Sequence, residues 1–168
     1  DMVDAFRDLE DKRFEEHQGV DWTRTLLGVV KSGFKEGGST ITQQLIKNLT
    51  GDNETSVKRK VQEIMRALEL EAKYDKDEIL ELYLNFIYLG QGCQGVKSAA
   101  ATYFGKELET LTTAECASLI SITNNPSLFD PYNVDPEVGL DGKENNRKRQ
   151  LNVLREMYLQ EWITESEY

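Results

Sequence analysis

Histidine, cysteine and proline are scarce in this chain of 168 residues, which has one, two and three of them. The two cysteines, Cys93 and Cys116, show no CxxC spacing, and with a single histidine a zinc site is not expected. We expect both thiols to be free and buried, as free cysteines usually are. The sequence also has no signal peptide and no run that approaches the roughly 18 apolar residues of a membrane span.

Positive charge is in the minority as well. The sequence has 20 Lys and Arg residues and 30 Asp and Glu residues. The resulting net charge of −10 argues against nucleic acid as a partner. The length fits one domain, residues 1–168, which can bury about two-thirds of its surface without disulfides. Because the chain opens in the middle of a pattern at Asp1, we expect it to be a fragment of a longer, membrane-anchored protein.

Helical periodicity dominates the hydrophobic pattern. One apolar stripe consists of Val57, Val61, Ile64, Met65, Leu68 and Ala72. A second consists of Ile79, Leu80, Tyr83, Leu84 and Ile87, and a last helix is marked by Leu151, Leu154 and Tyr158. No alternating run exceeds four residues, so the sequence predicts a mainly α domain without a substantial sheet.

The sequence also indicates where helices begin and where a loop interrupts them. Asp75 with Glu78 and Thr112 with Glu115 have the spacing of capping boxes, which open helices. All three prolines fall between residues 126 and 142, which predicts a long loop that is functional or mobile.

The first polar motif contains Glu10, Asp11, Phe14 and His17. On a helix, Phe14 and His17 would share a face with Glu10, because they follow it by four and seven residues. An aromatic wall raises the basicity of a carboxylate by excluding water, so Glu10 is a candidate general base or acid. The alternative is a solvated acidic pair, which is the usual state of such residues.

The second motif spans residues 37–48. Two glycines precede five polar residues between Ser39 and Gln44, and we expect these to line a site because a core would reject them. Thr40 with Gln43 fits a capping box, so a helix from about residue 40 would direct free N–H groups at an anion. The alternative is an ordinary capped helix.

Basic residues form a cluster in the segment 58–60, and Glu63 follows it. Guanidinium groups suit a diphosphate, so this cluster is a candidate phosphate clamp. The alternative is a surface salt bridge between Arg59 and Glu63, four residues apart on a helix. A second basic group, at 147–149, is predicted to open the last helix.

In this order the motifs resemble the peptidoglycan glycosyltransferases (glycosyltransferase family 51), which include the transglycosylase domain of class A penicillin-binding proteins and monofunctional enzymes. The matching blocks are Glu10-Asp11 to Phe14 and His17-x-Gly19; Gly38 to Gln44 with Lys47-Asn48; Arg59-Lys60-x-x-Glu63; Lys76-x-x-Ile79-Leu80-Glu81-x-Tyr83-Leu84-Asn85; and Arg149-x-x-x-Val153-Leu154. The sequence departs from the family pattern at Leu89, Cys93 and Gln94.

The resemblance implies a lysozyme-like helical fold with a larger head lobe and a small membrane-facing lobe. The implied substrates are lipid II and the growing lipid-linked glycan, at the extracytoplasmic face of a bacterial membrane. Glu10 would deprotonate the 4-hydroxyl of the acceptor sugar, which attacks C1 of the donor with inversion, and Glu63 would assist near the diphosphate.

The implied substrate-binding residues are Asp11, Phe14, His17, Ser39, Thr40, Gln44, Lys47, Asn48, Arg59, Lys60 and Arg149. The resemblance implies no required cofactor, with a divalent cation such as Mg or Mn as an optional one, and cell-wall synthesis proteins as further partners. Two alternatives stay open: a muramidase of lysozyme type with Glu10 as general acid, and a non-catalytic helical binding module.

The segment 22–35 has no acidic residue. At 100° per residue its basic residues form a narrow stripe: Arg24, Lys31 and Lys35. The opposite arc is apolar: Trp22, Leu26, Leu27, Val29, Val30 and Phe34. This pattern is typical of a helix in the lipid interface, and the alternative is a core helix with one solvated edge. With the resemblance, we expect an interfacial segment that is loosely packed without lipid.

Overall fold

A computed structural model describes residues 2–25, 38–51, 54 and 56–168. Helices make up most of these residues, which confirms the predicted mainly α fold. The strands among them, β1 (Val134–Asp135) and β2 (Leu140–Asp141), pair as one short antiparallel hairpin. In the described part of the chain no helix combines the length and apolarity needed to cross a bilayer. The chain forms two compact units: unit 1 is Asp1–Leu9 with Ile87–Tyr168, and unit 2 is Glu10–Phe86.

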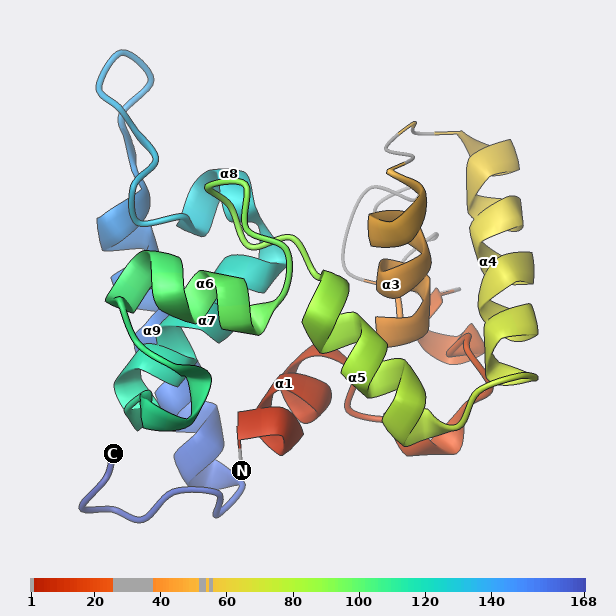
Figure 1. The fold of residues 1–168 in the computed structure, drawn as a ribbon, viewed down its shortest axis with the longest axis horizontal. Coiled ribbons are helices and arrows are strands. Elements are labelled where there is room, and N and C mark those ends of the chain that lie inside the picture. The colour runs from red at the N-terminus through yellow and green to blue at the C-terminus, as the bar shows by residue number, and fades with distance from the viewer. Residues whose placement is uncertain (1, 26–37, 52–53, 55) are drawn as a thin grey trace. The chain divides into compact units, whose positions relative to one another are not determined.

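Unit 2 is built around one helix. It contains the 3-10 helix η1 (Phe14–Glu16) and the helices α3 (Ile41–Thr50), α4 (Val57–Glu71) and α5 (Lys76–Phe86). Helix α3 lies between α4 and α5 and contacts both of them (Figure 1).

The loop after η1 approaches α4 closely at Gly19. This residue has φ +81°, and an added Cβ would lie 2.7 Å from the carbonyl oxygen of Ala67. Only glycine fits such a contact. The neighbouring apolar cluster contains Val20 and Ile46 together with Ala67, so it packs this loop, α3 and α4 together.

Unit 1 holds the remaining helices: α6 (Val96–Phe104), η2 (Leu108–Thr110), α7 (Thr113–Asn124), α8 (Pro126–Phe129) and α9 (Gly142–Leu159). Helix α1 (Met2–Glu10) starts in unit 1, and its last residue belongs to unit 2. Helix α7 is buried from Cys116 to Ile122 and packs against α9. Polar groups between them are paired, since Ser118 Oγ donates to Asn146 Oδ1 over 2.7 Å.

The predicted helix caps are confirmed. Thr40 with Gln43 and Thr112 with Glu115 form capping boxes. At the start of α5, the N–H of Asp75 donates to the side chain of Glu78 and the N–H of Glu78 donates to the side chain of Asp75, each over 2.9 Å. Both cysteines are free and buried, as expected.

The predicted apolar stripe on α4 is wrong in four of its six members, since Ala72, which follows the end of the helix, is exposed too. Val57, Val61 and Met65 are 62%, 53% and 54% exposed, whereas Ile64 and Leu68 pack against the apolar cluster. The buried residues of α4 are Lys60, Glu63 and Ala67. Because two of these carry charge, periodicity of apolar residues could not identify the face that α4 buries.

Two predictions about the C-terminal region also need correction. The stretch 126–142 contains α8 and the hairpin, so it is not a plain loop. Helix α9 begins at Gly142, ahead of the basic group at 147–149 that was predicted to open it. Asp141 starts it by accepting a bond from the N–H of Glu144, a side-chain cap that the sequence reasoning overlooked.

Candidate active site

Glu10 is the last residue of α1 and is 8% exposed. Its Oε2 atom accepts a hydrogen bond of 3.2 Å from the Nε2 atom of Gln44 on α3. The Oε1 atom of Gln44 in turn accepts one of 3.2 Å from the hydroxyl of Tyr83 on α5. The Nη1 atom of Arg24 donates to the carbonyl oxygen of Glu10 over 2.7 Å. Gln44 thus holds the carboxylate, Tyr83 holds Gln44, and Arg24 holds the backbone of Glu10.

The prediction that Phe14 and His17 share a helical face with Glu10 is wrong. Helix α1 ends at Glu10, so Phe14 and His17 do not continue its helical face. Phe14 is 1% exposed. The Nζ atom of Lys76 lies over the Phe14 ring, 4.4 Å from the ring centroid. The group that meets Glu10 is the amide of Gln44, so hydrogen bonding takes the place expected for an aromatic surface.

Asp11 and His17 form a second pair. The Oδ2 atom of Asp11 lies 2.9 Å from the Nε2 atom of His17, and it also accepts a bond of 3.0 Å from the N–H of Ile41. Ile41 is the first residue of α3, where a negative charge stabilises the helix. Asp11 is fully buried, and its contacts position the start of α3, so substrate binding by Asp11 stays a prediction.

The polar stretch before and within α3 is mostly internal, which corrects the expectation that a core would reject it. Thr40, Thr42 and Gln43 are fully buried. Thr40 donates from Oγ1 to the carbonyl of Gly19 over 2.6 Å, and Thr42 donates to Glu71 over 2.7 Å. Burial of the two hydroxyls and of the Gln43 Oε1 atom is tolerated because each is hydrogen-bonded, whereas the Nε2 atom of Gln43 is buried without a partner among the described residues. Thr40 is buried, whereas Ser39 and Gln44 are partly exposed, and substrate binding by these three residues stays a prediction.

A carboxylate between two cations lies on α4. The Nη1 atom of Arg59 lies 2.5 Å from Glu63 Oε2, and Lys60 donates to Glu63 Oε1. Lys60 also donates to Ser39 Oγ over 2.9 Å. Exposed fractions of 15%, 10% and 5% for the side chains of Arg59, Lys60 and Glu63 exclude a surface salt bridge. The three groups carry a net charge of +1, and Ser39 connects them to the start of α3.

The remaining predicted residues lie around these groups or in the other unit. Lys47 on α3 is exposed and Asn48 is half-buried. Arg149 belongs to unit 1, where its guanidinium carbon lies 5.4 Å from the centroid of the Phe129 ring. Substrate binding by these three residues stays a prediction.

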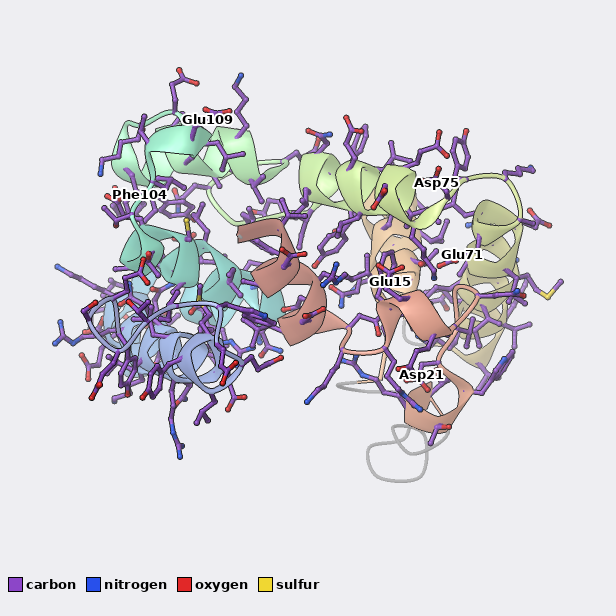
Figure 2. The ribbon with its side chains drawn as sticks, turned by 90° about the horizontal axis from the view of Figure 1, so that it is seen from below. Glu15, Asp21, Glu71, Asp75, Phe104 and Glu109 are labelled. Carbon is purple, nitrogen blue, oxygen red and sulfur yellow. The ribbon has the colours of Figure 1, made fainter. Side chains whose placement is uncertain are left out.

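Sequence reasoning missed two residues that connect the site. It placed Tyr83 in a core stripe and, with Lys76, in a block that matches the family, but neither gave a sign of the bond from Tyr83 to Gln44. Burial, together with the negative charges of Glu10 and Asp11, raises the pKa of Tyr83 well above its usual value. Lys76 donates to the carbonyl of His17 over 2.6 Å and to Glu71 over 2.8 Å. Figure 2 shows Glu71 and Asp75 near the turn that joins α4 to α5, just before this lysine.

The proposed interfacial segment begins at a capped turn. Asp21 accepts a bond of 3.0 Å from the N–H of Arg24, and residues 22–25 are helical. Trp22 is 60% exposed. Residues 26–37 lie outside the described residues, so the predicted membrane contact of 22–35 stays a prediction. Within the described ranges, no group of three or more His, Cys, Asp or Glu side chains is arranged to hold a metal ion.

These features define a helical domain with a buried carboxylate, and a carboxylate flanked by two cations on a neighbouring helix. The sequence profile of the transglycosylase family matches residues 1–158. The chain therefore belongs to the transglycosylase family.

Individual relatives agree with this assignment. The chain is 42% identical over 173 residues to penicillin-binding protein 1A of Vibrio cholerae, and the match covers 100% of this chain and 20% of that protein. It is 37% identical over 180 residues to penicillin-binding protein 1A of Clostridium botulinum, covering 99% and 21%. A transglycosylase homologue of Cupriavidus necator is 37% identical over 175 residues, covering 100% and 71%. The chain thus spans about a fifth of the length of the penicillin-binding proteins that it matches.

Proposed function

We propose that this domain is a peptidoglycan glycosyltransferase that polymerises lipid II into glycan strands. The donor is the growing glycan on its lipid diphosphate, and the acceptor is the 4-hydroxyl of the next lipid II. Membership of the transglycosylase family supports this activity. One observation supports assigning this activity to particular residues: a hydrogen bond of 3.2 Å holds the nearly buried Glu10 to Gln44.

Glu10 is the proposed base. It takes the proton of the acceptor 4-hydroxyl as the acceptor oxygen bonds to C1 of the donor, and the bond from C1 to the lipid diphosphate breaks with inversion. A base held in a fixed geometry at a site that excludes most water suits this step, since proton transfer requires close approach. Gln44 keeps one oxygen of the carboxylate in place by its hydrogen bond.

The cations on α4 are the proposed diphosphate site. The leaving diphosphate gains negative charge as the bond to C1 breaks, and preorganised cations stabilise this charge. Arg59 and Lys60 are held on opposite oxygens of Glu63, which fixes both cations while leaving a net positive charge. Glu63 therefore assists by orienting the cations, and the exposed Lys47 is a further proposed contact.

The location and partners follow from the substrate. We place the domain at the extracytoplasmic face of a bacterial membrane, where lipid II is presented, and cell-wall synthesis proteins are its proposed partners. Divalent cations such as Mg or Mn are proposed as optional, and turnover in the presence of EDTA measures that dependence.

Incubation with lipid II and, separately, with finished glycan strands tests the proposal. We expect lipid II to be converted into longer glycan and finished strands to stay intact. Shortening of the strands would instead support the muramidase alternative. Inactivity toward both substrates by a folded protein would support a binding module.

A further inference from the structure

Tyr83 has a buried hydroxyl that the proposed reaction does not use. The residue is fully buried on α5, in the middle of unit 2. A buried tyrosine hydroxyl usually finds a hydrogen-bond partner, often in the backbone. Here the partner is the side-chain oxygen of Gln44, at 3.2 Å. This contact is therefore directed at the residue that holds the proposed base.

The two ends of the Gln44 amide are chemically different. Its oxygen accepts hydrogen bonds and its nitrogen donates them. Because the hydroxyl of Tyr83 donates to the oxygen, the NH2 group is turned toward the Oε2 atom of Glu10. The reversed amide would place its oxygen against the carboxylate, where two acceptors repel each other. The carboxylate of Glu10 thus selects this amide orientation, and the hydroxyl of Tyr83 holds the amide in it by a second bond.

We propose that Tyr83 is a positioning residue for the reaction, which acts on Glu10 through Gln44. The inference rests on the proposed role of Glu10 as the base. Tyr83 touches neither substrate nor reacting atoms in this scheme. It fixes the amide, and the amide fixes the carboxylate in the geometry that accepts the proton.

Two physical effects support this role. Burial and the negative charges of Glu10 and Asp11 raise the pKa of Tyr83 well above its usual value, so the hydroxyl keeps its proton at any working pH. In addition, a bond to the amide oxygen polarises the amide and strengthens the bond that its nitrogen donates, as consecutive hydrogen bonds do in a low-dielectric interior.

The test is Tyr83→Phe, which keeps the buried ring and removes only the hydroxyl. We expect kcat for lipid II polymerisation to fall about tenfold, with KM nearly unchanged, because one neutral hydrogen bond in a linked network is lost. A purely structural role would lower the melting temperature and leave kcat of the folded protein as it was. Tyr103→Phe is the matched control, since that hydroxyl donates to the carbonyl of Leu89 in unit 1.

A double-mutant cycle with Gln44→Leu tests whether Tyr83 acts on Glu10 through Gln44. If Tyr83 acts through Gln44, Tyr83→Phe has no further effect on kcat in the Gln44→Leu background, so the two effects are not additive. Additive effects, or wild-type kcat in folded Tyr83→Phe, would overturn the inference. Glu10→Gln separates this from the proposed function: if that variant keeps its turnover, the base assignment itself is wrong, whatever Tyr83→Phe does.

Discussion

Lys60 donates a hydrogen bond from Nζ to the Oγ atom of Ser39 over 2.9 Å, between residues 21 positions apart in the sequence. The same ammonium group bonds to Glu63, and Lys60 as a whole is only 8% exposed. Ser39 directly precedes Thr40, the N-cap of α3. The bond therefore connects the cationic face of α4 to the N-terminal end of α3, where the helix dipole also favours negative charge. Both features suit the diphosphate proposed as leaving group.

Arg59→Ala should weaken handling of this diphosphate. Loss of a charge-assisted contact that is largely shielded from water costs about 2 kcal/mol, which corresponds to a roughly 30-fold fall in kcat/KM. Turnover of lipid II, compared with an analogue that has an uncharged linker, is the measurement. The analogue should be affected much less.

Lys58→Ala is the matched control for this prediction. Lys58 is the exposed neighbour of Arg59 on α4, so its loss changes the net charge equally without changing the buried cluster. Equal losses for both substrates in Arg59→Ala would show that this residue serves folding.

Glu10→Gln should reduce polymerisation by roughly 100-fold or more, since glutamine keeps the shape but accepts no proton. The rate of lipid II consumption by the folded variant measures this. Glu15→Gln, an exposed change with the same loss of charge, is the control and should stay close to wild type. A folded Glu10→Gln protein with near-normal turnover contradicts the assignment.

Sequence patterns correctly predicted those parts of the fold that interactions between nearby residues determine, such as helix starts. Capping boxes placed the starts of three helices, because each satisfies backbone N–H groups within four residues. Periodicity correctly gave the buried face of α5, where Ile79, Leu80 and Tyr83 are all buried. On α4 it failed, because pairing of Lys60 and Glu63 made burial of charge acceptable.

The candidate site shows the same limit. Sequence motifs named Glu10, Gln44 and Glu63, but they could not give the partners of these residues. The bond from Gln44 to Glu10 joins residues 34 positions apart, and the one from Tyr83 to Gln44 joins residues 39 apart. Nothing in a single sequence encodes such contacts directly. The prediction that Phe14 and His17 share a helical face with Glu10 failed because it assumed that the helix continued beyond Glu10.

Asp21→Asn should lower stability at neutral pH. Burial of Asp21 favours the neutral form, but the bond from Arg24 N–H and the Arg13 guanidinium outweigh it, so the pKa of this carboxyl is lowered. Its ionised form therefore stabilises the fold above the pKa of the unfolded state, and this contribution is lost as pH falls through the folded-state pKa. The side-chain oxygen of asparagine can still accept the bond from the N–H of Arg24 that caps the helix. The substitution therefore tests the negative charge of Asp21 and not the cap.

We expect the free energy of unfolding of Asp21→Asn to be lower than wild type by about 1 kcal/mol at neutral pH, with the gap closing toward about pH 3. Urea unfolding across that range is the measurement. Asp75→Asn, at the exposed cap of α5, should have the smaller effect. A gap that stays constant with pH would mean that the charge of Asp21 contributes nothing.

Membrane binding is predicted to depend on the segment 22–35. Leu27→Glu with Val30→Glu places two negative charges on its apolar arc, at positions outside the residues that the structure describes. We expect binding to anionic liposomes to fall about tenfold or more, because each charge opposes both burial in the interface and the anionic surface. The melting temperature should hardly change if the segment is not part of the core.

A second pair of substitutions makes this prediction specific. Val57→Glu with Val61→Glu adds the same charge to unit 2, at two exposed valines of α4. Liposome binding by that variant should stay close to wild type, since the contact is assigned to 22–35 and not to net charge. Equal losses in both variants would point to general electrostatic repulsion. A large fall in melting temperature with unchanged liposome binding in Leu27→Glu with Val30→Glu would place the segment in the core, because burial of two new carboxylates there destabilises the fold directly.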